Sequence, residues 1–262
     1  MSYAYGAAVA AMGFLVVRAA PTPTSAAHAA ALFVHGLRLN AFLLWREVHV
    51  ERFRSNRESV EASARASGGR LQRAPFILCC SALYACMSAP IILSARAQAA
   101  GRLTASLVAI AWAGLVLGAI GDVTKSWVKA RRGPDTLVVS GVYRLFRHPN
   151  YTGTQTAGSH PSHGGYQTRS ETHLDPNTGE QVLWTSSMLA GVAATAAGGV
   201  ASLRASSGLL LGSLLGWAAI CFVLARATAE LERKHAARYD TFTRWRASSW
   251  GGVGLRRRLS DR

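Results

Sequence analysis

The chain has 262 residues, half of them hydrophobic, and its 29 lysines and arginines against 13 aspartates and glutamates give a net charge of +16. A positive excess of this size is typical of proteins that meet nucleic acids or membrane surfaces. The basic residues lie between long apolar runs, and no zinc-finger spacing or aromatic–basic RNA-binding pattern accompanies them. We therefore expect a lipid bilayer, and no nucleic acid, as the partner.

Six apolar stretches are candidates for membrane-spanning helices, since about 20 apolar residues cross a bilayer. The first has no clear signal-peptide cleavage pattern and further spans follow it, so we interpret it as a span. The sequence thus predicts an all-α, polytopic helix bundle that forms a single membrane domain over residues 1–262. The six predicted spans are 3–20, 26–45, 75–95, 103–121, 182–203 and 208–225.

The composition of these spans predicts how they pack. The second span contains His35, Arg38 and Asn40, whose polar side chains must face the protein interior or a wet cavity because they are costly in lipid. The last two spans are rich in Gly, Ala and Ser, which suits close approach of neighbouring helices.

The basic residues predict the orientation of the chain. Residues 46–74 and 122–181 contain seven lysines and arginines each, and the tail 226–262 contains ten. Such segments stay on the cytosolic side of a membrane. Six spans then place both termini and all three basic segments in the cytosol, or on the equivalent face of an organelle.

Cysteines and histidines do not predict a metal site. The four cysteines fall within apolar runs, where we expect them to be small core residues and neither disulfide partners nor ligands. Three histidines of a polar stretch have neither cysteines nor a defined scaffold beside them. These residues are Cys79, Cys80, Cys86 and Cys221, and His160, His163 and His173.

Two charged segments adjoin the spans. Acidic and basic residues alternate between Arg46 and Glu61, a pattern typical of a solvated helix face. After the fourth span come Asp122, Lys125 and Lys129, and the two lysines share one face of a continuing helix. That face can reach lipid phosphates or the phosphates of a cofactor, and the residues alone leave both alternatives open.

The segment 141–153 reads Gly-Val-Tyr-Arg-Leu-Phe-Arg-His-Pro-Asn-Tyr-Thr-Gly. Pro149 lacks a backbone donor and disfavours helix at His148, which predicts a shaped turn at the start of a helix. Arg144 and Arg147 carry planar, permanently charged groups suited to phosphate or carboxylate. Such a segment beside a bilayer favours a site for an anionic cofactor, with a basic loop on lipid headgroups as the alternative.

Residues 154–179 interrupt this motif with a polar stretch rich in Thr, Ser, Gly and His, and a Thr-Gly pair stands at each border. Its composition cannot bury enough apolar surface to fold alone, so we expect a disordered insertion. If the insertion loops out, Glu180 returns beside Asn150 and Tyr151. If it does not, the site is broken.

With the insertion removed, the chain resembles an uncharacterised membrane family (DUF1295-like) related to the C-terminal domain of steroid 5-alpha-reductases. That family belongs to a wider group with isoprenylcysteine carboxyl methyltransferases and phospholipid methyltransferases. The resemblance covers most of the chain. It rests on the segments 38–46, 122–125 (Asp-x-x-Lys), 141–144 (Gly-Val-Tyr-Arg) and 147–151 (Arg-His-Pro-Asn-Tyr), and on Glu180, Trp184, Glu232 and Tyr239.

The resemblance implies an oxidoreductase that reduces a lipophilic, steroid- or prenyl-like enone with NADPH. The Arg-His-Pro-x-Tyr string does not separate reductases from methyltransferases, but Asn150 and the Asp-x-x-Lys segment favour the reductase branch. The implied catalytic residues are Glu180, Tyr151 and His148. The implied cofactor-binding residues, with the tail 226–262 completing the site, are Asp122, Lys125, Lys129, Arg144, Arg147, His148, Asn150, Tyr151, Glu232, Arg238 and Tyr239.

Two alternatives stay open at this point. The same residues would hold S-adenosylmethionine in a methyltransferase of the isoprenylcysteine or phospholipid type. An inactive family member is the third interpretation, because the insertion separates the motif from Glu180 and the tail after Trp245 lacks the proline-containing end usual in the family. We expect an integral, multi-pass protein of the endoplasmic reticulum or an organellar membrane. The sequence identifies neither the substrate nor the oligomeric state.

Overall fold

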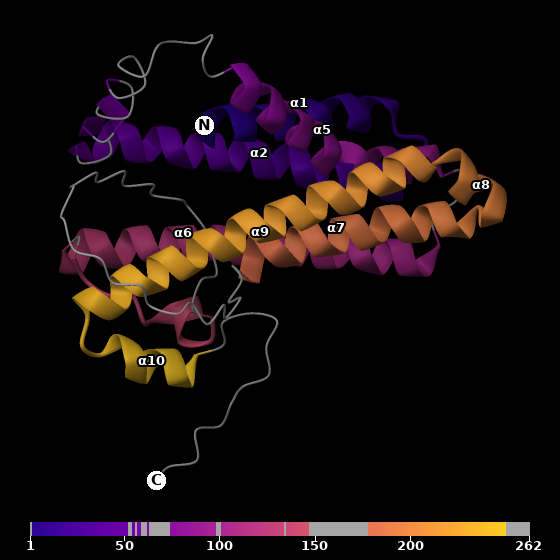
Figure 1. Cartoon of the computed structure of the whole chain (residues 1–262). Coiled ribbons are helices and arrows are strands. Elements are labelled where there is room, and N and C mark those ends of the chain that lie inside the picture. Colours follow the sequence, from indigo (N-terminus) through magenta and orange to yellow (C-terminus); the bar gives the residue numbers. More distant parts are fainter. Residues whose placement is uncertain are drawn as a thin grey trace, which may run out of the picture.

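The computed structural model describes residues 2–51, 54–55, 57–58, 62, 74–97, 101–133, 135–146 and 178–249, and almost all of them lie in helices. Figure 1 shows a bundle of long helices with shorter elements at its two ends. The elements in chain order are α1 (Ser2–Ala19), α2 (Pro23–His49), α5 (Ala74–Arg96), α6 (Arg102–Arg132), the 3-10 helix η1 (Gly141–Arg144), α7 (Thr178–Ala197), α8 (Gly199–Ala205), α9 (Ser207–Arg238) and α10 (Phe242–Ser248).

The long helices alternate in direction, so their ends form two distinct poles (Figure 1). The C-terminal ends of α2, α6 and α9 lie at one pole with α10, and we call it the basic end. The short helix α8 lies at the other pole, which we call the α8 end. The three basic segments predicted to share one side of the membrane all adjoin the basic end.

Helix α7 occupies the middle of the bundle, where it packs against α5, α6 and α9. Gly114 of α6 permits the closest of these approaches, since a Cβ there would lie 2.7 Å from the backbone nitrogen of Leu183. One hydrophobic core then joins α1, α2, α5, α7 and α9. It consists of Val9, Ala29, Leu32, Met87, Ile91, Trp184, Ile220 and Leu224.

The predicted polytopic helical architecture is confirmed, with four candidate spans in the described residues where six were expected. By length and composition, α2, α5, α6 and α9 can cross a membrane, which identifies an integral membrane protein. The stretches 3–20 and 182–203 are helical but are not among the four. The apolar part of α1 is short, and α7, enclosed by other helices, carries several polar residues that lipid-facing helices exclude.

One predicted span was wrong, for a local reason. The stretch 182–203 is not one helix, because the chain turns at Gly198 and Gly199. Gly199 has a φ of 74°, which glycine adopts without strain. The predicted continuation of the fourth span as a helix through Lys125 and Lys129 is confirmed, since α6 extends to Arg132 and ends where Gly133 has a φ of 95°. The cysteines also differ from expectation, since Cys79 is exposed on α5 and the other three are only half-buried.

Beyond the bundle, the basic end carries a small second layer. Helix η1 lies against the C-terminal part of α6, with Val128, Val138 and Tyr143 forming a separate apolar cluster. Trp245 of α10 packs on this cluster. The Gly-Val-Tyr-Arg segment is therefore held between α6 and the tail of the chain.

Candidate functional site

The polar residues of α2 lie on the face that this helix buries. Its buried positions include Ser25, Leu32 and Leu39 at spacings of seven, with His28 and His35 beside them. Continuing the seven-residue spacing from Leu39 leads to Arg46, which is also buried, at 8% exposure. The prediction of a solvated helix face was therefore wrong for Arg46, because the inward stripe of α2 extends to its last turn.

Helix α6 presents a matching inward stripe. Its buried positions 104, 108, 111, 115, 118 and 122 advance by three or four residues, as one face of a helix does. Asp122 is the last buried residue of that series, at 3% exposure. Lys125 and Lys129 continue the same spacing toward the basic end and are half-buried. The local helix geometry thus points all three residues toward the interior.

Four helices bring polar side chains together in the bundle. We call Tyr5, His35, Arg38, Asp122 and Glu180 the inner polar cluster. Arg38 Nη1 lies 3.1 Å from Asp122 Oδ2, and His35 Nε2 lies 3.7 Å from Glu180 Oε1. The Tyr5 ring stands edge-on to His35, with the ring centroids 6.2 Å apart. Arg38 and Asp122 both lie within electrostatic range of the Glu180 carboxylate.

Several atoms of this cluster are buried without a hydrogen-bond partner in the described part of the chain. They include the Tyr5 hydroxyl, both ring nitrogens of His35 and Nε of Arg38. The separation of His35 from Glu180 exceeds a hydrogen-bond length. Because buried polar atoms are nearly always satisfied, such a concentration indicates a place where a ligand or water completes the bonding.

Cations surround the cluster on the side toward the basic end. Arg46 and Lys125 lie close enough to Asp122 to interact with it electrostatically, and Lys129 interacts with Lys125. With Arg38, four cationic side chains thus accompany the two carboxylates of Asp122 and Glu180. This positive excess at the edge of a low-dielectric interior favours an anionic group.

Exposed aromatic residues mark a level near the basic end of the spans. On α2, Trp45 stacks between Phe42 and His49. On α6, the Arg131 guanidinium lies 4.1 Å from the centroid of Trp127, which is 55% exposed. Aromatic rings of this kind gather where lipid headgroups meet the hydrocarbon.

The two helices keep a constant register, which fixes the depth of the cluster below that aromatic level. Arg38 pairs with Asp122 and the Ala27 carbonyl accepts from Trp112, so contacting residues are 84 and 85 positions apart. Arg38 precedes Trp45 by seven residues, or about 10 Å along the helix. The inner polar cluster therefore lies below the headgroup level, on the hydrocarbon side.

The predicted tail residues take part in a different set of contacts. Glu232 is buried, and its Oε2 lies 3.2 Å from Nε of Arg246. Arg238 forms an ion pair with Asp135 and lies 5.8 Å from the Tyr239 ring centroid. These contacts hold α9 and α10 to the end of α6.

The motif is described only in part. Tyr143 is buried and donates a 3.4 Å hydrogen bond to the Gly121 carbonyl, one residue before Asp122. Arg144 is exposed at the end of η1. Four predicted site residues lie outside the described residues, as does nearly all of the predicted insertion 154–179. They are Arg147, His148, Asn150 and Tyr151.

Sequence reasoning placed Glu180 and Asp122 in the site but missed four contributors. His35 and Arg38 were expected to face inward without a role being assigned. Arg46 was misplaced, although the seven-residue spacing of α2 contained the signal. Tyr5 carried no signal at all, because nothing in the Ala- and Gly-rich first helix distinguishes it from Tyr3.

Fold and site together define a polytopic helical membrane protein with a polar cluster enclosed by four helices. The family described as "Protein of unknown function (DUF1295)" matches residues 2–157, more than half of the chain. The chain belongs to this family, as its sequence motifs predicted. The match contains Tyr5, His35, Arg38 and Asp122, and it ends before Glu180. Neither the curated proteins nor the solved structures include a match to the chain.

Proposed function

We propose that this protein is a membrane oxidoreductase that reduces a lipophilic enone with NADPH. One observation carries the proposal. The buried carboxylate of Glu180 lies 3.7 Å from Nε2 of His35, and neither His35 ring nitrogen nor the Tyr5 hydroxyl makes a hydrogen bond within the described part of the chain. Polar atoms left open inside an apolar bundle suit a substrate that enters from the bilayer and carries one polar group.

The residues around Asp122 fit the anionic cofactor. Lys125 and Lys129 follow the inward stripe of α6 toward the basic end, and Arg46 accompanies them on α2. Guanidinium and ammonium groups of this arrangement bind phosphates. In the proposed complex these three side chains hold the phosphates near the headgroup level, and the nicotinamide end points to the inner polar cluster.

The inner polar cluster supplies the groups that the chemistry requires. NADPH, when bound, gives a hydride to the β-carbon of the enone, and a proton then completes the reduction at the α-carbon. The Tyr5 hydroxyl or a ring N–H of His35 donates a hydrogen bond to the carbonyl oxygen, where negative charge develops. Glu180 orients His35 for this task, and the surrounding apolar core excludes water.

The resemblance to the steroid 5-alpha-reductase C-terminal domain supports the same assignment. It implies that Asn150 and Arg147 contact the cofactor and that Tyr151 or His148 are further hydrogen-bond donors to the substrate. Tyr143, which precedes them in the same motif, is bonded to the Gly121 carbonyl next to Asp122.

S-adenosylmethionine-dependent methyl transfer is the second candidate. The observation in its favour is the pair of buried carboxylates, Asp122 and Glu180, because a sulfonium cation is stabilised beside negative charge. Close alignment of donor and acceptor then accounts for most of the rate. An isoprenylcysteine carboxylate or a phospholipid amine would be the acceptor.

A ligand-binding experiment separates these candidates. The full chain and a variant lacking residues 154–179 are purified in detergent, and melting is followed with NADPH, NADP⁺ or S-adenosylmethionine. NADPH is expected to raise the melting temperature, and Lys125→Ala to abolish the rise. Lys234→Ala is the matched control, since Lys234 lies exposed on α9 and pairs with Glu230. A rise with S-adenosylmethionine alone overturns the proposal in favour of methyl transfer.

Transfer of the hydride is tested directly. Protein in lipid vesicles is supplied with NADPH deuterated on the nicotinamide and with sterol or prenyl enones. Deuterium is expected at the β-carbon of the product, and Glu180→Gln is expected to lower the rate strongly while the cofactor still binds. An inactive family member would bind neither cofactor, with or without residues 154–179.

A further inference from the structure

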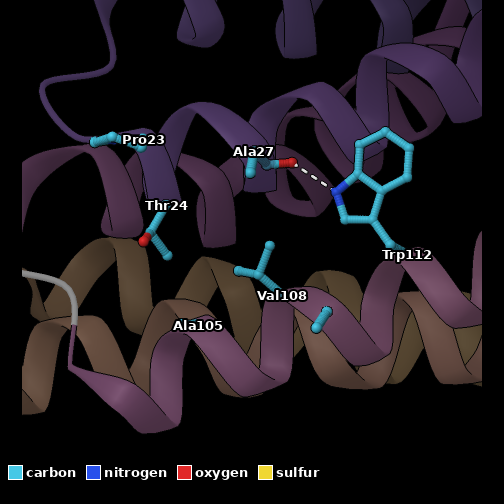
Figure 2. A pocket seen from close by; sticks show the side chains of 7 residues that line it. Pro23, Thr24, Ala27, Ala105, Val108 and Trp112 are labelled. Atoms are coloured by element: carbon cyan, nitrogen blue, oxygen red, sulfur yellow. Dashed lines mark hydrogen bonds between the residues drawn. The ribbon is translucent and has the colours of Figure 1, made fainter.

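A second feature of the bundle lies far from the inner polar cluster. Between the first turns of α2 and α6, at the α8 end, there is a hollow of about 340 Å³. Figure 2 shows Val108 projecting from α6 into the space between Thr24 and the Trp112 indole. We call this hollow the α2–α6 groove. It is lined by Pro23, Thr24, Ala27, Ala105, Val108, Ala109 and Trp112.

The groove is closed toward the middle of the bundle and open on its outer side. The Trp112 indole donates a 3.0 Å hydrogen bond to the Ala27 carbonyl and so bridges the two helices (Figure 2). Val108 is buried at the floor, whereas Ala105 and Ala109 are exposed. From Ala27 to Arg38 is eleven residues, or about 16 Å. The groove is therefore separate from the proposed catalytic site.

The outer rim of the groove carries a positive charge. Arg102 is exposed at the first position of α6, and it lies one turn before Ala105 on the same helix face. Both helices are candidate membrane spans, so the apolar part of the groove lies in hydrocarbon and Arg102 lies at the headgroup level of the leaflet at the α8 end. An apolar trough below a cation matches the shape and charge of a phospholipid.

We propose that the α2–α6 groove binds one acyl chain of a phospholipid whose phosphate contacts Arg102. The small side chains of Ala105 and Ala109 leave room for the chain, and the Trp112–Ala27 bridge limits its depth. The bound lipid chain lies between the two helices beside the Trp112–Ala27 bridge. This site does not depend on the proposed reductase activity.

Photochemical labelling tests the proposal. The full-length protein in nanodiscs is irradiated with phosphatidylglycerol carrying a diazirine on its acyl chain, and labelled peptides are mapped by mass spectrometry. Label is expected on 105–112 and 23–27. Ala109→Trp fills the groove and is expected to remove that label, whereas Ile110→Trp, on a neighbouring exposed face, keeps it. Ala105→Leu serves in place of Ala109→Trp if the latter is not monodisperse.

The headgroup contact has its own test. Arg102→Gln is expected to lower groove labelling by phosphatidylglycerol about fivefold, the effect of one basic residue at an anionic surface. A diazirine fatty alcohol without phosphate is expected to label the groove weakly. Label spread evenly over α5, α6 and α9, or groove label unchanged in Ala109→Trp, overturns the proposal. Cross-linking of two copies of the chain at position 105 would likewise overturn the proposal, because a second copy would then cover the groove.

Discussion

The two polar regions of the molecule, the inner polar cluster and the tail contacts, differ in how completely their atoms are bonded. In the tail contacts, Glu232 pairs with Arg246 and Arg238 with Asp135, and the arginines are partly exposed. In the inner polar cluster the residues are deeper, and the Tyr5 hydroxyl and the His35 nitrogens make no hydrogen bond within the described chain. The ion pairs of the tail contacts have both partners and are partly exposed to solvent, and they hold neighbouring elements together. Buried groups that lack hydrogen bonds within the described chain are available to a ligand, which is why the proposed function rests on the inner polar cluster.

The largest change in stability is expected when the Arg38–Asp122 pair is broken. Arg38→Met removes the cation that contacts Asp122 most closely in the described chain and leaves Arg46 and Lys125 as its more distant cations, so the free energy of unfolding is expected to fall by about 3 kcal/mol. The double variant Arg38→Met, Asp122→Leu is expected to recover much of the loss, because it removes both charges. Unfolding in mixed micelles, followed by circular dichroism, gives the three values. If the double variant is as unstable as Arg38→Met, the loss of stability does not come from the unpaired charge of Asp122.

Glu180→Gln separates function from stability. The amide keeps the shape of the side chain without a charge, so the free energy of unfolding is expected to rise by about 1 kcal/mol as a buried carboxylate is removed. Enone reduction is expected to fall at the same time. Thermal unfolding and turnover are measured on the same preparation, with Glu230→Gln on the exposed face of α9 as the control. Loss of stability would instead assign Glu180 a structural role.

The tail contacts are expected to respond more weakly. Trp245→Phe removes the 3.1 Å hydrogen bond from the indole to the Tyr143 carbonyl while keeping an aromatic ring on the apolar cluster. The expected loss is about 1 kcal/mol. Limited proteolysis of the segment after η1 reports whether the motif loosens, and Trp217→Phe, which loses a hydrogen bond to Thr185, is the matched substitution inside the bundle.

The smallest effect is expected at Arg238. Its side chain is 48% exposed and that of Asp135 is 65% exposed, so Arg238→Ala is expected to change the free energy of unfolding by about 0.5 kcal/mol. NADPH affinity is measured in parallel by titration of the melting temperature. A large loss of affinity without loss of stability would return Arg238 to the cofactor site that the resemblance implied.

The sequence contained much of the fold because lipid imposes strong rules on composition. Charged residues inside an apolar run, such as His35 and Arg38, had to face inward, and they do. The buried stripes of α2 and α6 are also present in the spacing of the sequence. At Arg46 the alternation of charges predicts a solvated face, and the spacing of the stripe predicts the buried position that the structure shows. The break at Gly199 was missed because glycine pairs are frequent in spans that pack closely.

Other features depend on packing that no single segment encodes. Nothing in α1 indicates that Tyr5 faces His35, since that contact requires the pairing of α1 with α2. The register that sets Trp112 beside Ala27 and Asp122 beside Arg38 likewise arises from the fit of two helices that precede and follow α5 in the chain. The α2–α6 groove depends on the same pairing of helices. Small residues on α6 leave a hollow only where no large side chain of α2 fills the space opposite them.

The placement of Glu180 on α7 has a consequence for biosynthesis. Tyr5, His35, Arg38 and Asp122 all emerge from the ribosome before the polar stretch 154–179, and their carboxylate partner emerges after it. Until α7 joins the bundle, His35 therefore lacks the carboxylate that lies beside it in the folded protein, and the cluster is completed only by the second half of the chain.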